Sequence, residues 1–343
     1  MTDVIDVLIV ERRSEARDAL SALLNGADDL RVVGVSADAE AALRMVVRAR
    51  PRIVLLGADL PGAVLLTRRI MTEHPTPIVA LVDPDEAELG AALLLEGAVS
   101  VQLRPRQSAT VARFCTVVAA LSQVSVVRRR GVTEPRPGPA IAGDAARRSG
   151  KRAAARMVAV AASTGGPVAL QRLLANLRED LRAPVLIVQH IVSGFTAGLA
   201  ETLQLASPLP ITVARDQELL VPGTVYVAPD GRHLTVTPNG RARLRDDPPV
   251  SGFRPSATVL FSSLASAYGP AGLAVILTGM GTDGLAGLHE VHAAGGRVLA
   301  QDRESSVVYG MPGAAVTAGI AAVTAPIEEL AAHIARFTKT EDD

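Results

Sequence analysis

Aromatic residues and cysteine are scarce in this sequence. It contains no tryptophan, its aromatic content is 2%, and Cys115 is its one cysteine. A single cysteine excludes an intramolecular disulfide and fits a reducing compartment. The shortage of aromatic rings argues against a surface that stacks nucleic-acid bases. Cys115 itself is expected to pack as a small apolar residue rather than to act as a nucleophile.

An excess of either charge is also absent. Lys plus Arg and Asp plus Glu both number 35 in 343 residues, so the composition does not favour nucleic acid or an anionic membrane as a partner. The first residues lack a basic segment followed by a long apolar stretch, and no apolar run is long enough to span a bilayer. We therefore expect a cytoplasmic protein that neither binds nucleic acid nor inserts into a membrane.

Short apolar runs alternate with amphipathic stretches in the first third of the chain. Helices are predicted at 14–24 and 37–49, and strands at 4–10, 31–35, 53–56, 78–82 and 99–103. Repeated βα units predict a parallel sheet with helices on both faces. Because 343 residues exceed the usual size of one domain, two domains are expected.

A Pro-, Gly- and Arg-containing segment interrupts this pattern at 123–155 and is expected to be a solvated linker. It would separate a domain at 1–122 from one at 156–343. The α/β pattern returns in the second domain, where helices are predicted at 168–177, 196–205 and 284–294, and strands at 157–162, 183–189, 272–277 and 297–300. The fold class is therefore α/β, with two doubly wound parallel sheets.

Reactive side chains follow three of the strands predicted in the second domain. Ser163 and His190 each come directly after a strand, and Asp283 follows another through the turn at 278–282. In an open parallel sheet, ligands bind beyond the carboxyl ends of the strands, so these side chains are expected to meet at one edge. They could then act as a nucleophile, a general base and the carboxylate that orients the base.

The turn after Ser163 is rich in glycine, which lets a substrate approach the backbone N–H groups of Thr164 and Gly165. A helix that begins near Pro167 would add a favourable dipole. The alternative is that Ser163 is merely the N-cap of that helix. The hydrolase motif G-x-S-x-G is absent, because Ala161 stands at its first glycine, and neither nucleotide-binding glycine motif occurs at this turn. No cofactor or metal is expected.

Six segments together resemble the chemotaxis protein-glutamate methylesterases, the CheB type. They read AASTGGP (161–167), VQHI (188–191), VYVAPDGRHL (225–234), RPSATVLF (254–261), ILTGMGTDG (276–284) and AQDRESSVVYGMPGAA (300–315). The resemblance covers about 155–325. It implies a Rossmann-like catalytic domain, a triad of Ser163, His190 and Asp283, and an oxyanion site that includes the backbone of Met280.

The resemblance also implies a reaction. Methyl groups would be removed from glutamyl methyl esters on chemoreceptors, with methanol as product, and certain receptor glutamines would be deamidated. The implied partner is a methylated chemoreceptor or another methylated signalling protein, with a histidine-kinase complex as a further candidate. Thr258 departs from the family pattern, where an acidic residue is expected. We expect this change to alter the substrate rim and to leave the triad untouched.

The segment 4–121 resembles a flavodoxin-like response-regulator receiver, but the residues that such a domain uses for phosphorylation differ. The acidic pair that binds Mg²⁺ is represented by Glu11 and Arg12, and Gly57 stands at the phosphoacceptor position. The hydroxyl residue is replaced by Val82, and the lysine by Arg104. Aspartyl phosphorylation needs a carboxylate beside a divalent cation, so a degenerate receiver without phosphorylation at the usual site is expected.

Asp59, two residues after Gly57, offers a rival interpretation as a shifted phosphoacceptor. If phosphorylation is lost, the domain either covers the catalytic edge until a partner binds or leaves the esterase constitutively active. Three alternatives to the esterase are a glutamine deamidase with little esterase activity, a non-catalytic scaffold in a two-component signalling complex, and a DNA-binding response regulator. The last lacks a helix-turn-helix segment after the linker.

Several other polar residues admit a structural interpretation. His289 and His292 lie one residue short of the H-E-x-x-H zinc spacing, and a solvated helix face explains them better. His233 either lines the cleft or packs in the core. Arg254 and Arg303 either steer an acidic segment of the substrate or are ordinary surface charges.

Overall fold

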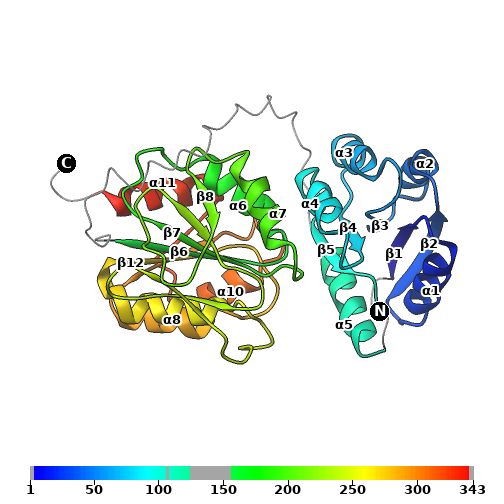
Figure 1. Cartoon of the computed structure of the whole chain (residues 1–343). Coiled ribbons are helices and arrows are strands. Elements are labelled where there is room, and N and C mark those ends of the chain that lie inside the picture. The colour runs from blue at the N-terminus through cyan, green and yellow to red at the C-terminus, as the bar shows by residue number, and fades with distance from the viewer. Residues whose placement is uncertain (1–3, 106–107, 124–155, 340–343) are drawn as a thin grey trace. The chain divides into compact units, whose positions relative to one another are not determined.

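The computed structural model describes residues 4–105, 108–123 and 156–339, and only the backbone within 108–113 (Figure 1). The chain forms two compact units, Met1–Glu134 and Pro135–Asp343. Apart from Gln123, the predicted linker lies outside the described residues, so the domain bounds at 122 and 156 stay a prediction. Of the helices in the described ranges, none combines the length and hydrophobicity needed to cross a bilayer.

The first unit contains a five-stranded parallel sheet in the order β2-β1-β3-β4-β5. This is the flavodoxin-like strand order, as predicted. Its strands are β1 (Ile5–Val10), β2 (Leu30–Ser36), β3 (Ile53–Gly57), β4 (Ile78–Val82) and β5 (Ser100–Leu103). Every residue of β3 and β4 is buried, which explains why these strands read as unbroken apolar runs rather than alternating patterns.

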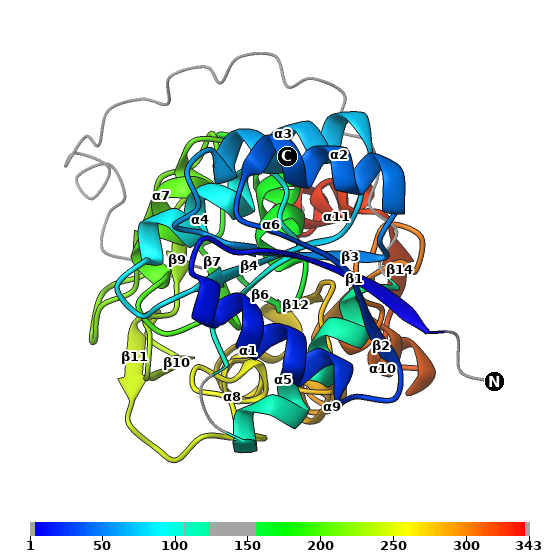
Figure 2. The ribbon, with the colours of Figure 1, turned by 90° about the vertical axis from the view of Figure 1, so that its right-hand side faces the viewer.

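Helices cover both faces of this sheet. Figure 2 shows α1 and α5 on one face and α2, α3 and α4 on the other. Their bounds are α1 (Ser14–Asn25), α2 (Ala39–Ala49), α3 (Ala63–Glu73), α4 (Ala87–Leu95) and α5 (Ser108–Leu121). Helix α2 begins where its sequence suggests, because the Asp38 carboxylate accepts a 2.7 Å hydrogen bond from the N–H of Ala41.

The second unit contains a seven-stranded parallel sheet in the order β14-β13-β12-β6-β7-β9-β8. This arrangement confirms the predicted doubly wound, Rossmann-like sheet. The strands are β6 (Met157–Ala162), β7 (Val185–Gln189), β8 (Ile211–Val213), β9 (Val225–Val227), β12 (Gly272–Ile276), β13 (Arg297–Gln301) and β14 (Val323–Ala325). A separate antiparallel hairpin pairs β10 (His233–Val236) with β11 (Ala242–Arg245).

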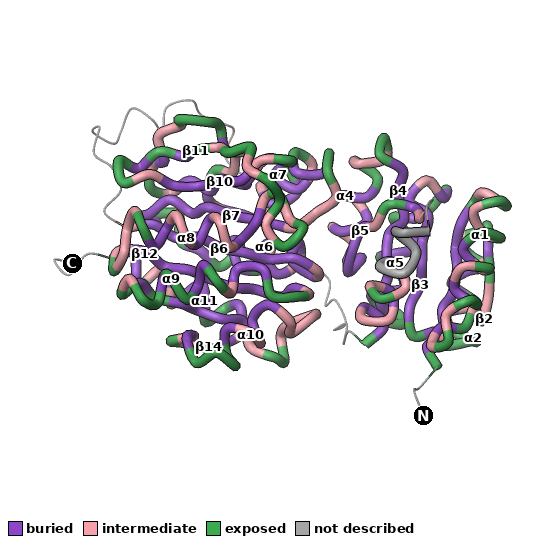
Figure 3. Tube along the Cα trace, turned by 90° about the horizontal axis from the view of Figure 1, so that it is seen from below, coloured by how far each residue is buried: buried purple, intermediate pink, exposed green. Residues whose placement is uncertain are grey.

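Two hydrophobic cores lie on opposite faces of this sheet. Val158, Val160 and Ala162 of β6 face one core, and the alternate residues Met157, Ala159 and Ala161 face the other. The first core is covered by α6 (Gly166–Ala175), α7 (Thr196–Gln204) and α11 (Ile327–Thr338), and the second by α8 (Ala257–Tyr268), α9 (Leu285–Ala293) and α10 (Met311–Thr317). Strands β6, β7 and β12 run between them as a buried layer (Figure 3).

The strand order of this sheet indicates where along the sheet a ligand is expected to bind. After β6 the chain continues into β7 on one side, and it later returns as β12 on the other side of β6. The sheet therefore changes winding direction around β6, which is the point where open α/β sheets bind ligands. The strands and helices predicted from the sequence coincide with observed ones, and their ends differ by one or two residues.

Candidate active site

Ser163 and His190 lie next to each other because of the register between β6 and β7. Ala162 pairs with Gln189 at the carboxyl ends of these strands, and the N–H of His190 donates a 3.0 Å hydrogen bond to the carbonyl of Ala162. The Gln189 side-chain amide then donates to the carbonyls of Ser163 and His190, at 2.7 and 2.8 Å. This amide fixes the two residues relative to each other.

His190 is hydrogen-bonded to Asp283. Its Nε2 lies 2.9 Å from Oδ2 of Asp283, and the side chains are 6% and 0% exposed. The other ring nitrogen, Nδ1, is buried and has no hydrogen-bond partner within the described part of the chain. The structure therefore joins the predicted base and carboxylate directly. Strand register places Ser163 next to His190, and within the described residues no hydrogen bond joins its hydroxyl to the imidazole.

Ser163 does not cap the helix that follows it. Helix α6 has Gly165 at its N-cap, without a side-chain hydrogen bond, so the N-cap alternative is wrong. Gly165 has a φ of +76°, and a side chain there would overlap Val307. Glycine is thus required at the turn that separates Ser163 from the helix.

Asp283 is surrounded by hydrogen-bond donors. Its Oδ1 accepts from the hydroxyls of Ser256 and Thr258, at 2.7 and 2.9 Å, and its Oδ2 accepts from the N–H of Ala257 at 2.7 Å. These residues form the N-terminus of α8, where the helix dipole favours a negative charge. Burial opposes ionisation, but hydrogen bonds from His190 and Ser256 outweigh it and lower the pKa of Asp283 to about 2.

The expectation that Thr258 leaves the triad untouched is wrong. Its hydroxyl donates to Asp283 and also accepts a 2.9 Å hydrogen bond from the N–H of Gly284. A carboxylate at this position would repel Asp283, whereas a hydroxyl stabilises it. The contact was not predicted from the sequence, because no helix was predicted to begin here. Ser256 followed by an apolar run was the available signal, since serine is a favoured N-cap.

The turn that carries Met280 packs against Ser163. The N–H of Ser163 donates to the carbonyl of Thr278 at 3.0 Å, and the hydroxyl of Thr278 donates to the carbonyl of Thr164 at 2.9 Å. A Cβ on Gly279 would lie 2.8 Å from the Cβ of Ser163, so only glycine fits there. Within the described residues, the N–H groups of Thr164, Gly165 and Met280 make no backbone hydrogen bond.

An open depression of about 870 Å³ lies beside this turn. Gly281 and Thr282 line it, together with Tyr309, Arg303 and residues of α10. The Arg303 guanidinium lies over the Tyr309 ring, 4.4 Å from its centroid. Arg303 is thus held at the edge of the depression by its contact with Tyr309.

The remaining histidines and Arg254 have structural explanations. His233 is fully buried, accepts a hydrogen bond from the N–H of Ser256 at Nδ1 and donates to the carbonyl of Pro248 from Nε2. The packing alternative is therefore correct. His289 and His292 are exposed on α9, and no group of metal-binding side chains occurs among the described residues. Arg254 donates to the backbone carbonyls of residues 246 and 247.

A second contact of the site was not anticipated from the sequence. The ring of Phe253 stacks on the His190 imidazole, with centroids 3.9 Å apart and planes 8° from parallel. Phe253 belongs to a turn outside the sheet, so no strand pattern indicated its place.

Cys115 is a half-buried residue of α5, and burial raises the pKa of its thiol. This disfavours the thiolate and agrees with its expected packing role.

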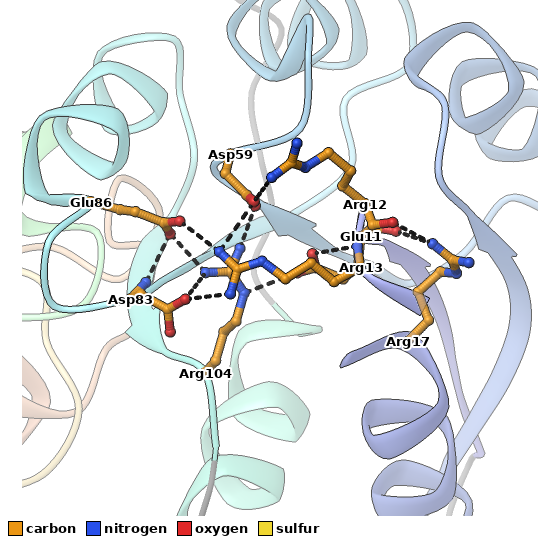
Figure 4. Close-up of polar contacts among 8 residues, drawn as sticks. All are labelled: Glu11, Arg12, Arg13, Arg17, Asp59, Asp83, Glu86 and Arg104. Atoms are coloured by element: carbon orange, nitrogen blue, oxygen red, sulfur yellow. Dashed lines mark hydrogen bonds and ion pairs between the residues drawn. The ribbon is translucent and has the colours of Figure 1, made fainter. Parts of the chain in front are cut away.

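The carboxyl ends of β1, β3, β4 and β5 in the first unit hold a buried ion-pair cluster around Arg104 (Figure 4). The Arg104 side chain is 6% exposed. Its guanidinium bonds Glu11 at 3.0 Å, Asp59 at 2.5 Å and Glu86 at 2.7 Å, and lies 3.2 Å from Asp83. Burial disfavours this cation, but the hydrogen bonds that it donates to Glu86 and Glu11 prevail and raise its pKa.

Arg13, not Arg12, is the second cation of the cluster, although Arg12 stands at the expected Mg²⁺-binding position. Arg13 bonds Asp83 at 2.6 Å, Glu86 at 3.0 Å and Asp59 at 3.2 Å. Arg12 is 57% exposed and touches only the edge of the cluster, 3.3 Å from Asp59. Residue 13 follows the expected acidic pair, and its direction could not be read from the strand pattern alone.

Comparisons with known proteins agree with the geometry of the second unit. The model of the CheB methylesterase family matches residues 158–334. The catalytic domain of Thermotoga maritima CheB methylesterase, a crystal structure, is 36% identical with a TM-score of 0.51, and the match covers 53% of this chain and 97% of that domain.

Similarity to curated proteins extends over both units. A protein-glutamate methylesterase/protein-glutamine glutaminase of Myxococcus xanthus is 45% identical over 347 residues, which is 97% of this chain and 96% of the relative. One of Anaeromyxobacter dehalogenans is 45% identical over 336 residues, 94% of this chain and 96% of that protein. The sequence similarity to these relatives therefore spans both units of this chain.

Proposed function

This chain belongs to the CheB methylesterase family, and we propose that it is a protein-glutamate methylesterase and protein-glutamine glutaminase with Ser163, His190 and Asp283 as its catalytic triad. Its substrates are glutamyl methyl esters, and certain glutamines, of chemoreceptors or similar methylated signalling proteins. The observation that carries the proposal is the buried 2.9 Å contact between His190 and Asp283, at the strand end adjoining Ser163.

The two ring nitrogens of His190 have different roles in the proposed reaction. Nε2–H donates to Asp283, which holds the tautomer that leaves Nδ1 unprotonated. Nδ1 accepts the proton of the Ser163 hydroxyl as its oxygen bonds the ester carbonyl carbon. The resulting imidazolium is stabilised by Asp283, which is ionised at neutral pH because its pKa is about 2.

The leaving group and water complete the cycle. The tetrahedral intermediate collapses by breaking the bond to methoxide, which takes the proton from Nδ1 and departs as methanol. His190 then removes a proton from water, and the resulting hydroxide attacks the acyl group on Ser163. Collapse of the second intermediate releases the glutamate side chain and returns the proton to Ser163. With a glutamine substrate, the first leaving group is ammonia.

Backbone groups stabilise the negative oxygen of each tetrahedral intermediate. The candidates are the N–H groups of Met280, Thr164 and Gly165, which make no backbone hydrogen bond among the described residues. The turn at 278–282 is held against Ser163, because the N–H of Ser163 donates to the carbonyl of Thr278. The N-terminus of α6 adds a positive partial charge behind them.

We propose further that aspartyl phosphorylation does not regulate the chain. Gly57 offers no oxygen, and Arg104 and Arg13 lie among the carboxylates where a phosphorylated receiver would hold a divalent cation. Asp59 is engaged by three guanidinium groups, which reduces the nucleophilicity of its carboxylate. A histidine-kinase complex remains a candidate partner of the first unit, without transfer of a phosphoryl group.

Product analysis tests the proposed activity. The full chain is incubated with a methylated chemoreceptor, and methanol and ammonia are measured separately, with and without acetyl phosphate. The proposal expects methanol release at a rate that acetyl phosphate does not change. Ammonia without methanol would indicate a glutamine deamidase. Release of neither product, with intact binding to the receptor, would favour a non-catalytic scaffold.

A further inference from the structure

We propose that Phe253 is a positioning residue for His190, which holds the imidazole plane and stabilises its protonated form during the reaction. This inference rests on the proposed function, in which His190 is the base. Its structural basis is the stack itself, with ring centroids 3.9 Å apart and an interplanar angle of 8°. Such close, parallel contact restricts rotation of the imidazole about its bond to Cβ.

The stack supplies a restraint that hydrogen bonding alone lacks. Asp283 fixes Nε2 of His190, while Nδ1 is unpartnered among the described residues. A ring held at one nitrogen can still tilt about that hydrogen bond, and a tilt would move Nδ1 away from the Ser163 hydroxyl. A flat ring packed against the imidazole face opposes that tilt. Because misplacement by about 1 Å can cost about 100-fold in rate, this restraint bears directly on turnover.

A tight turn holds Phe253 in place. Phe253 and Val250 exchange two backbone hydrogen bonds, of 2.9 and 3.1 Å. The two residues between them, Ser251 and Gly252, have φ values of +52° and +82°, as in a type I′ turn. Ser251 tolerates a conformation that non-glycine residues seldom adopt. The turn therefore presents the aromatic ring on a short, internally bonded support.

The electrostatics of the stack favour the charged form of His190. The face of an aromatic ring is negative and attracts a cation lying over it. The imidazole becomes cationic when it takes the proton of Ser163, and Phe253 covers one face of it. Phe253 thus stabilises the imidazolium in addition to orienting the ring. A residue that only filled space would not have this effect.

Nuclear magnetic resonance of His190 in the full-length chain tests the stack without relying on the esterase assay. The His190 ring protons are assigned by comparison with His190→Gln and recorded in the wild type, Phe253→Leu and Phe253→Tyr. We expect ring protons shifted upfield by the Phe253 ring current in the wild type. In Phe253→Leu that shift is lost, whereas Phe253→Tyr retains it. Unshifted resonances in the wild type would overturn the proposal even if the leucine variant failed to fold.

Kinetics of the same variants test the consequence for turnover. Phe253→Leu is expected to lower kcat by roughly 10- to 100-fold and to change KM by less than about threefold, while Phe253→Tyr remains within about threefold of the wild type. A leucine variant with normal kcat, or with only a raised KM, would contradict the positioning role. If Ser163→Ala retains full activity, the proposed function fails, while the resonance measurements still decide whether the stack exists.

Discussion

A Cβ atom on Gly57 would lie 2.6 Å from Oε2 of Glu11, at the end of the strand where a receiver carries its phosphoacceptor. The same Cβ would also lie 3.2 Å from a guanidinium nitrogen of Arg104. The missing side chain at position 57 is thus matched by carboxylate and guanidinium groups that occupy its space.

Restoring the acceptor alone should therefore fail. We expect Gly57→Asp to remain unlabelled by acetyl phosphate and to lose about 1–3 kcal/mol of unfolding free energy through overpacking. Phosphate-affinity electrophoresis and urea unfolding measure these two effects, with Asp59→Asn as the control for labelling at the neighbouring carboxylate. Stoichiometric label on Gly57→Asp, or label on the wild type that Asp59→Asn removes, would show that the pocket still accepts a phosphoryl group.

The cluster itself should contribute to stability through Arg104. Arg104→Met leaves the buried carboxylates without their main positive partner, and we expect a loss of about 3–5 kcal/mol from the unfolding free energy. Arg12→Met is the matched control because its side chain is 57% exposed and makes one 3.3 Å contact in the cluster. Its expected effect is under about 1 kcal/mol. Equal effects of the two substitutions in urea unfolding would refute the assignment of Arg104 as the main cation.

Thr258 should influence catalysis through Asp283. Thr258→Val removes a donor from the carboxylate, and we expect kcat to fall about 10-fold, in line with the loss of one hydrogen bond to a charged group. Thr258→Ser keeps the hydroxyl and should retain near-normal kcat. Thr258→Asp adds a negative charge that stabilises the imidazolium, so the acid limb of its kcat/KM profile should move to higher pH. A profile that coincides with the wild type would argue against electrostatic contact with the triad.

The lowered pKa of Asp283 predicts a pH-dependent contribution to stability. The folded value of about 2 lies below the ordinary 3.8, so the ionised carboxylate stabilises the fold above pH 4. That contribution is lost as the pH falls from about 4 through about 2. The difference between the unfolding free energies of the wild type and Asp283→Asn should therefore shrink by about 2 kcal/mol as the pH falls over this interval. A constant difference between them would mean that the pKa is not lowered.

The sequence predicted the sheet edge better than it predicted the neighbours of the triad. Apolar runs that end in Ser163, and in Gln189 just before His190, define strands whose ends must meet once the sheet is parallel. Thr258 and Phe253 come from a helix start and a turn, whose placement depends on tertiary packing and leaves no periodic signal. Arg13 was missed for a related reason, because a long side chain after a strand can point in several directions.

The central claim is that Ser163 attacks the ester, and methanol release by Ser163→Ala tests it most directly. Full-length wild type and variant are compared on one methylated chemoreceptor preparation, with circular dichroism to confirm that the variant is folded. The account predicts that release falls by roughly 10⁴- to 10⁶-fold, as in other serine triads. A folded Ser163→Ala that releases methanol at a rate close to that of the wild type would contradict it.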